Sequence, residues 1–116
     1  MEVVIYHNPR CSKSRQTLQL LEDKGITPNV INYLEDVPTA DTLKIIFSQL
    51  GLGSVREMMR TKESIYKELN LGDDILSDEQ LFDAMSKNPK LIERPIVVAN
   101  QKAKLGRPPE QVLELF

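Results

Sequence analysis

A strand pattern runs directly into a helix pattern at the start of the chain, and the only cysteine lies at the junction. Residues 3–6, VVIY, form a short β-branched and aromatic run, which favours a strand. Downstream, Leu18 and Leu21 recur at helical spacing until Gly25, which supplies a left-handed stop. The sequence therefore predicts a helix over residues 12–24 that begins next to the cysteine.

The middle of the chain carries mostly helical patterns. A second short strand is predicted over residues 29–33, which completes a β-α-β unit with parallel strands. An amphipathic helix is predicted to follow Thr39 and to stop at Gly51, and residues 54–71 fit one broken helix or two short ones. A capping box, SDEQ at residues 77–80, predicts the start of a further helix.

Strand patterns return near the C-terminus. Residues 95–99 and 102–105 flank Asn100 and Gln101, an arrangement typical of a tight antiparallel hairpin. The GRPP stretch that follows breaks the chain. A final short helix is then expected to pack on the sheet through apolar residues at 112–116.

The order of these elements predicts an α/β fold. A β-α-β half and a β-β-α half are separated by a helical insertion at about residues 39–90. This is the order of a thioredoxin-like domain, in which a four-stranded mixed sheet is flanked by helices. The length of 116 residues is that of one ordinary domain, so we expect residues 1–116 to form a single domain.

Composition and charge argue against several classes of function. The net charge is −2 and the basic residues are dispersed, which argues against nucleic acid as a partner. No apolar run approaches membrane-spanning length and no leader pattern precedes the first strand, so we expect a cytoplasmic protein without membrane contact. One histidine and one cysteine cannot form a tetrahedral metal site alone, so no metal is expected. We expect a monomer, because no long apolar stripe is left after the core is assigned.

Cys11 falls at or beside the first turn of the first predicted helix, in the stretch HNPRCSKSR. Unpaired backbone N–H groups and the positive end of the helix dipole favour a thiolate there. His7 and the basic residues of this stretch are expected to add positive charge, and Ser14 lies on the same helical face, from which its hydroxyl could reach the sulfur. A lone cysteine is often an inert small hydrophobe, but these polar neighbours favour a nucleophile.

Several separated motifs resemble those of the glutaredoxin-linked arsenate reductase family. They are YHNPRCSKSR at residues 6–15, Arg60, ERP at residues 93–95 and LGRPP at residues 105–109, and they agree in order and spacing over essentially the whole chain. The resemblance implies a thioredoxin-like fold with a helical insertion. It also implies reduction of arsenate to arsenite, with glutathione and glutaredoxin as electron donors and no bound cofactor.

The resemblance also implies roles for particular residues. Cys11 is expected to attack arsenate. Arg60, Arg94 and Arg107 are expected to bind the oxyanion, because guanidinium groups match its charge and its acceptor oxygens. Pro95 is expected to follow a cis peptide bond beside the active cysteine.

Two further catalytic residues are expected in the same loop, and the reductant must come from outside the chain. His7 and Ser14 are expected to polarise or orient the Cys11 thiolate. Because the chain has a single cysteine, an external thiol must attack the arsenic adduct on Cys11.

Two other functions use the same residues. A glutathione-dependent thiol reductase acting on another substrate would use the arginines to recognise the carboxylates of glutathione. A redox-sensing regulator that binds RNA polymerase is a second alternative, since such regulators share this fold and sequence family. Many of them carry a Cys-x-x-Cys pair, whereas residues 11–14 here are CSKS and lack the disulfide partner.

Overall fold

The computed structural model describes residues 2–116, which form two compact units. One unit contains the chain up to Asp36 together with Arg94–Phe116, and the other contains Val37–Glu93. The strands are β1 (Val3–His7), β2 (Asn29–Asn32), β3 (Ile96–Ala99) and β4 (Lys102–Leu105). The α-helices are α1 (Ser12–Asp23), α2 (Ala40–Leu50), α3 (Ser64–Glu68) and α4 (Asp78–Lys87), and the 3-10 helices are η1 (Val55–Met58), η2 (Pro89–Leu91) and η3 (Pro109–Leu115).

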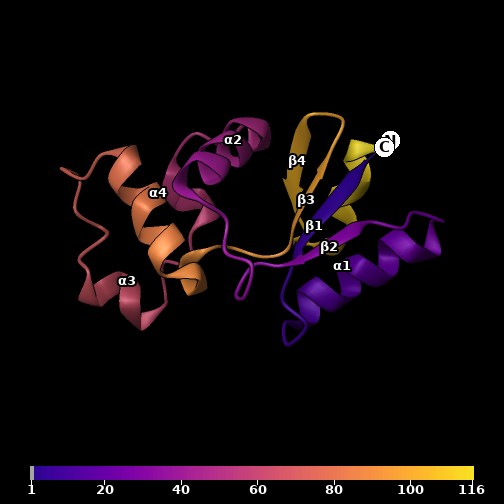
Figure 1. The fold of residues 1–116 in the computed structure, drawn as a ribbon, viewed down its shortest axis with the longest axis horizontal. Coiled ribbons are helices and arrows are strands. Elements are labelled where there is room, and N and C mark those ends of the chain that lie inside the picture. The colour runs from indigo at the N-terminus through magenta and orange to yellow at the C-terminus, as the bar shows by residue number, and fades with distance from the viewer. Residues whose placement is uncertain (1) are drawn as a thin grey trace. The chain divides into compact units, whose positions relative to one another are not determined.

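The first unit is built on a four-stranded mixed sheet of order β2-β1-β3-β4 (Figure 1). β1 runs parallel to β2 and antiparallel to β3, and β3 runs antiparallel to β4. Ile5 of β1 lies opposite Val30 on one side and Val97 on the other. The predicted α/β fold with a mixed sheet is therefore confirmed.

An apolar cluster lies in the core of this unit. The alternating pattern of β1 buries Val3 and Ile5, where they pack with residues of β3, α1 and η3. Burying such side chains stabilises the fold by about 1.5–3 kcal/mol each, so the cluster fixes α1 and η3 against the sheet. The residues of the cluster are Val3, Ile5, Leu21, Val97, Ala99, Val112 and Leu115.

The ends of the strands follow from turn chemistry. Asn100 and Gln101 have φ values of 55° and 62°, the left-handed values that a two-residue hairpin turn requires. β2 ends at Asn32, one residue before the predicted end, because the Asn32 carbonyl accepts hydrogen bonds from the N–H groups of Glu35 and Asp36. The final helix, η3, is a 3-10 helix.

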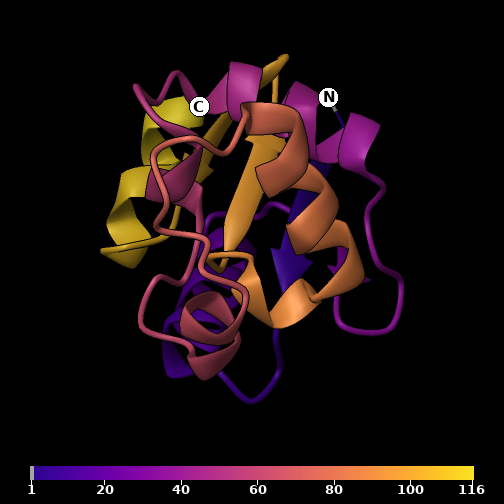
Figure 2. The same ribbon diagram turned by 90° about the vertical axis from the view of Figure 1, so that its left-hand side faces the viewer.

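The second unit, Val37–Glu93, consists of helices and connecting turns, as predicted for the insertion (Figure 2). Thr39 caps α2 by accepting a hydrogen bond from the N–H of Thr42, and Gly51 ends it with a φ of 67°. The predicted capping box of Ser77 and Gln80 is present at the start of α4. Residues 54–71 hold two short helices, η1 and α3.

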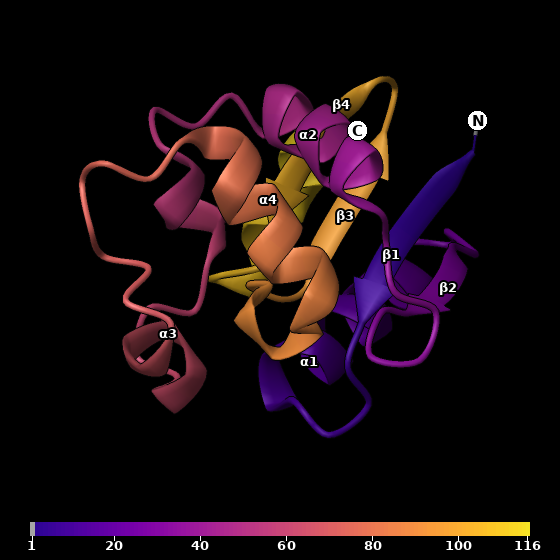
Figure 3. The same cartoon turned by 60° about the vertical axis from the view of Figure 1, so that its left-hand side comes forward.

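Helices α2 and α4 pack side by side within the second unit (Figure 3). The rings of Phe47 and Phe82 lie 5.8 Å apart between centroids, and Lys44 forms an ion pair with Glu79 at 2.8 Å. Among residues 2–116, no helix has the length and apolar character to cross a bilayer. The same residues contain no group of three or more side chains placed to hold a metal ion.

Candidate active site

Cys11 lies where the loop after β1 enters α1. It is the N-cap residue of α1, it is half-buried, and its thiol is free. Its N–H donates to the carbonyl of Asn8 at 3.0 Å, and its carbonyl accepts the first helical hydrogen bond from Arg15 at 3.0 Å. Its side chain makes no capping hydrogen bond. The N–H groups of the first turn of α1 therefore have no cap from this side chain and can bind an anion beside the sulfur.

Ser14 connects the end of β1 to the first turn of α1. Its Oγ lies 2.7 Å from Nδ1 of His7 and accepts a hydrogen bond from the backbone N–H of Asn8 at 3.0 Å. Ser14 is fully buried and His7 is 7% exposed, so water does not compete strongly for these contacts. The sequence placed His7 and Ser14 in the site but gave no indication that they contact each other.

The surroundings of His7 favour the neutral form of its imidazole. Burial lowers the pKa of its imidazole below the usual 6.5, and the positive charge of Arg15 lowers it further. Both effects oppose the expectation that His7 contributes a positive charge near the sulfur. His7 instead offers a neutral imidazole to the hydroxyl of Ser14.

Asn8, Arg10 and Arg15 shape the loop that precedes Cys11. The Asn8 side-chain oxygen accepts a hydrogen bond from the N–H of Arg10 at 3.0 Å, which closes a turn around Pro9. The Arg15 guanidinium donates through Nη1 to the carbonyl of Pro9 at 3.1 Å. Arg15 therefore holds the loop against α1, a structural role that the sequence analysis did not identify.

Thr17 and Gly106 form a close contact that the sequence analysis also missed. Thr17 is fully buried in α1 and donates through Oγ1 to the carbonyl of Lys13 at 2.8 Å. A Cβ on Gly106 would lie 2.5 Å from Oγ1 of Thr17 and 2.7 Å from Cγ of Pro95. Only glycine fits here without displacing its neighbours. The sequence offered one sign of this close contact, a glycine directly before Arg107.

Arg94 and Arg107 are joined by a hydrogen bond within the first unit. Nη1 of Arg107 donates to the backbone carbonyl of Arg94 at 2.9 Å. The peptide bond between Arg94 and Pro95 is cis, as the family resemblance implied, and the bond between Arg107 and Pro108 is also cis. Two of the three expected oxyanion ligands therefore lie close to each other.

Arg60 belongs to the second unit, after η1. Its N–H donates to the carbonyl of Leu91 at 2.7 Å, and its Nε lies 2.9 Å from Oε1 of Glu63. Its guanidinium is thus half-buried beside a carboxylate, which holds the side chain in one orientation. The grouping of Arg60 with Arg94 and Arg107 stays a prediction.

Comparison with known proteins assigns the chain to a family. The model of the ArsC family matches residues 6–115. An arsenate reductase of Haemophilus influenzae is 55% identical over the full length of both chains. An uncharacterized protein of Escherichia coli, YfgD, is 61% identical over 98% of this chain and 96% of its own. The solved structure of an arsenate reductase from Vibrio cholerae covers 100% of this chain and 98% of its own, with 66% identity and a TM-score of 0.98. With its thioredoxin-like sheet and the loop that carries Cys11, the chain belongs to the ArsC family.

Proposed function

We propose that this chain is an arsenate reductase that uses glutathione and glutaredoxin as electron donors. The observation that carries the proposal is the free, half-buried thiol of Cys11 at the start of α1, beside backbone N–H groups that its own side chain leaves uncapped. The names of the Haemophilus influenzae and Vibrio cholerae relatives support arsenate as the substrate.

Arsenate would bind at the first turn of α1 with guanidinium groups as further ligands. Its negative charge favours the N-terminus of a helix, and its oxygens accept hydrogen bonds from guanidinium groups. The Arg107 guanidinium is already restrained by its hydrogen bond to the backbone carbonyl of Arg94, so less of its side-chain entropy would be lost when it binds the ligand. Arg60 is the third proposed ligand.

In the first step, the Cys11 thiolate would attack arsenic. A sulfur–arsenic bond forms and an arsenic–oxygen bond breaks, and the departing oxygen takes up two protons and leaves as water. Arsenic stays in the +5 state. The product is an arsenate thioester on Cys11.

His7 and Ser14 would act as a pair in this step. Ser14 has one hydroxyl proton, and its oxygen already accepts the N–H of Asn8. When the neutral imidazole of His7 carries its proton on Nδ1, it donates to Ser14, and the hydroxyl proton is then available to the Cys11 thiolate. Ser14 would thus stabilise the thiolate, and His7 would orient Ser14.

Reduction needs two thiols from outside the chain, because Cys11 is the only cysteine. Glutathione would displace a second arsenic oxygen as water and form a bond to arsenic. The thiolate of glutaredoxin would then attack the glutathione sulfur, so that a mixed disulfide leaves and its bonding electron pair reduces arsenic to the +3 state. Hydrolysis returns the Cys11 thiol and releases arsenite. In total, one arsenate and two thiols give one arsenite, one disulfide and one water.

This cycle requires no bound metal or other cofactor, and a monomer in the reducing cytoplasm could carry it out. It is tested by arsenate-dependent oxidation of NADPH in an assay coupled to glutathione, glutaredoxin and glutathione reductase. We expect activity in the parent protein and none in Cys11→Ser, which keeps the size of the side chain but removes the nucleophile. A parent protein without arsenate-dependent turnover would contradict the proposal and favour a thiol reductase for another substrate or a polymerase-binding regulator.

A further inference from the structure

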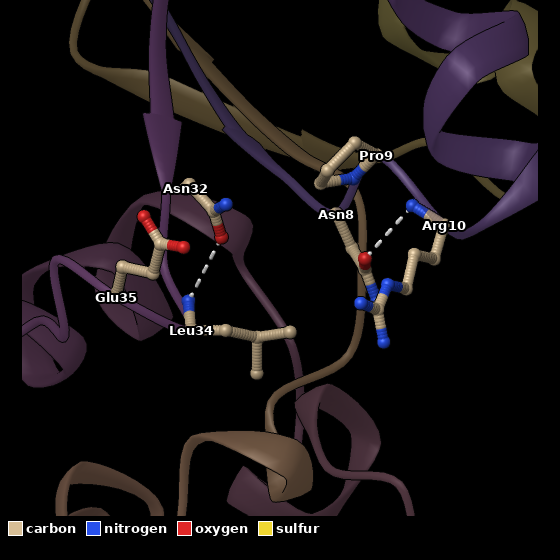
Figure 4. Close-up of a pocket in the computed structure, with 6 residues that line it drawn as sticks. All are labelled: Asn8, Pro9, Arg10, Asn32, Leu34 and Glu35. Carbon is tan, nitrogen blue, oxygen red and sulfur yellow. Dashed lines mark hydrogen bonds between the residues drawn. The ribbon is translucent and has the colours of Figure 1, made fainter.

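A pocket of about 320 Å³ lies beside the loop that precedes Cys11, within the first unit. Its volume falls in the range of small-molecule sites, about 300–1,000 Å³. One wall is the turn of Asn8, Pro9 and Arg10, and the other is the end of β2 with the segment that follows it (Figure 4). The residues of the second wall are Asn32, Leu34 and Glu35.

The two asparagines of the pocket present their amide N–H₂ groups to a ligand. The side-chain oxygen of Asn8 accepts the N–H of Arg10 at 3.0 Å, and that of Asn32 accepts the N–H of Leu34 at 3.3 Å. Because the oxygens are used by backbone N–H groups, the orientation of both amides is fixed. In the described part of the chain, neither N–H₂ group has a hydrogen-bond partner, so both can donate to a carbonyl or carboxylate oxygen.

Two opposite charges lie on opposite sides of the pocket. Figure 4 shows Arg10 beside Asn8 and Glu35 beside Asn32, with the side chain of Leu34 between the two charged groups. Over residues 2–116, neither the Arg10 guanidinium nor the Glu35 carboxylate makes an ion pair or a side-chain hydrogen bond. A ligand that carries an ammonium and a carboxylate would satisfy both charges.

We propose that this pocket binds the reducing co-substrate as a zwitterionic thiol peptide, the chemical class of glutathione. The inference rests on the proposed function, because it assigns a site to the thiol which that function requires. The γ-glutamyl ammonium pairs with Glu35, the carboxylate at the glycine end pairs with Arg10, and the peptide carbonyls accept the amide protons of Asn8 and Asn32. The cysteinyl part of the ligand then lies over Leu34.

The position and the charge of the pocket suit this ligand better than arsenate. Three of the pocket residues, Asn8, Pro9 and Arg10, directly precede Cys11, so the pocket adjoins the loop that presents the thiol. The Glu35 carboxylate repels an oxyanion with close to two negative charges, whereas it attracts an ammonium group.

The first test measures KM for glutathione at saturating arsenate and a fixed concentration of glutaredoxin. Glu35→Gln and Arg10→Gln should each raise KM for glutathione about three- to tenfold, as expected for the loss of one charge-assisted contact at a partly exposed site. The KM for arsenate should change by less than about twofold. Glu22→Gln and Lys24→Gln remove the same charges from exposed positions of the first unit outside the pocket, and they should leave KM for glutathione unchanged.

The second test does not depend on turnover. S-methylglutathione, which cannot react, is titrated into the parent protein while the side-chain amide resonances of Asn8 and Asn32 are followed by NMR. Both resonances should shift. An S-methylglutathione analogue that lacks the γ-glutamyl ammonium should bind several-fold more weakly to the parent protein but with the same affinity as S-methylglutathione to Glu35→Gln, because the partner of the ammonium is then already gone.

The outcomes separate this inference from the proposed function. If the parent protein reduces arsenate but both pocket variants keep the parental KM for glutathione, the pocket assignment is wrong and the proposed function stands. If S-methylglutathione shifts both amides but no arsenate turnover occurs, the pocket assignment stands and the proposed function fails. If the variants change only the KM for glutaredoxin and S-methylglutathione does not bind, the surface recognises the protein donor, which overturns the inference.

Discussion

Gly106→Ala tests whether the close packing of Gly106 against Thr17 and Pro95 excludes a side chain at position 106. The new Cβ would lie 2.5 Å from Oγ1 of Thr17, 2.7 Å from Cγ of Pro95 and 3.2 Å from its Cδ. The first two distances are far below van der Waals contact, and the ring of Pro95 cannot rotate away as a flexible side chain can. Relief requires α1 and the residues around Pro95 to move apart.

The expected cost follows from these contacts. Overpacking a well-packed site costs about 1–3 kcal/mol. Replacing glycine by alanine also reduces the entropy of the unfolded chain, which offsets about 0.4–1 kcal/mol. We expect a net loss of about 1–2 kcal/mol in the free energy of unfolding, which for a chain of this length lowers Tm by roughly 4–8 °C.

Urea and thermal unfolding followed by circular dichroism would measure this loss. Gly53→Ala is the matched control, because the nearest atom to its Cβ would be Oε2 of Glu57 at 3.6 Å, an ordinary contact. Adding Thr17→Ala to Gly106→Ala should recover only part of the stability, because the contact with Pro95 remains. A Gly106→Ala protein as stable as the parent would refute the reasoning.

Three further predictions concern His7, Ser14 and Arg107. The single histidine should titrate by NMR with a midpoint below 6.5, and Arg15→Gln should raise that midpoint, because it removes the charge that lowers the pKa of His7. Since the unfolded state then binds more protons below pH 6.5, His7 should reduce the free energy of unfolding as pH falls through that value, an effect that should be missing in unfolding experiments on His7→Gln. Ser14→Ala should cost about 1–3 kcal/mol in urea unfolding, because the buried His7 ring and the Asn8 N–H lose their partner, and it should lower kcat for arsenate. Arg107→Ala should raise KM for arsenate about tenfold, with Arg107→Lys in between, because lysine keeps the charge but not the planar fork.

The local signals in the sequence were sufficient for most of the fold. The β-branched and aromatic run at residues 3–6, the capping box that begins at Ser77 and the hairpin at Asn100 are signals that act over a few residues. Each predicted element is present. The sheet order did not follow from these signals, because it depends on contacts between distant strands. The resemblance to a known fold predicted a four-stranded mixed sheet but no strand order, and the order β2-β1-β3-β4 came from the structure.

The site was predictable in its residue types but not in its contacts. The position of Cys11 at the start of a helix followed from the adjacent strand and helix patterns. The lowered pKa of His7 did not, because it depends on burial by the folded unit. The contact between Thr17 and Gly106 joins residues far apart in the chain, so no local pattern could show it. The pocket wall formed by residues 32–35 was missed for the same reason.

Asn8 shows how one residue connects the thiol with the proposed thiol-peptide pocket. Its N–H donates to Ser14, its carbonyl accepts the N–H of Cys11, and its side-chain oxygen accepts the N–H of Arg10. The two contacts that position the reactive cysteine use backbone groups, which every residue possesses. The contact on the pocket side uses the side chain. A substitution at Asn8 that keeps the backbone conformation therefore acts first on the pocket and only indirectly on Cys11. At this one position, recognition of the thiol peptide can be separated from the positioning of the Cys11 nucleophile.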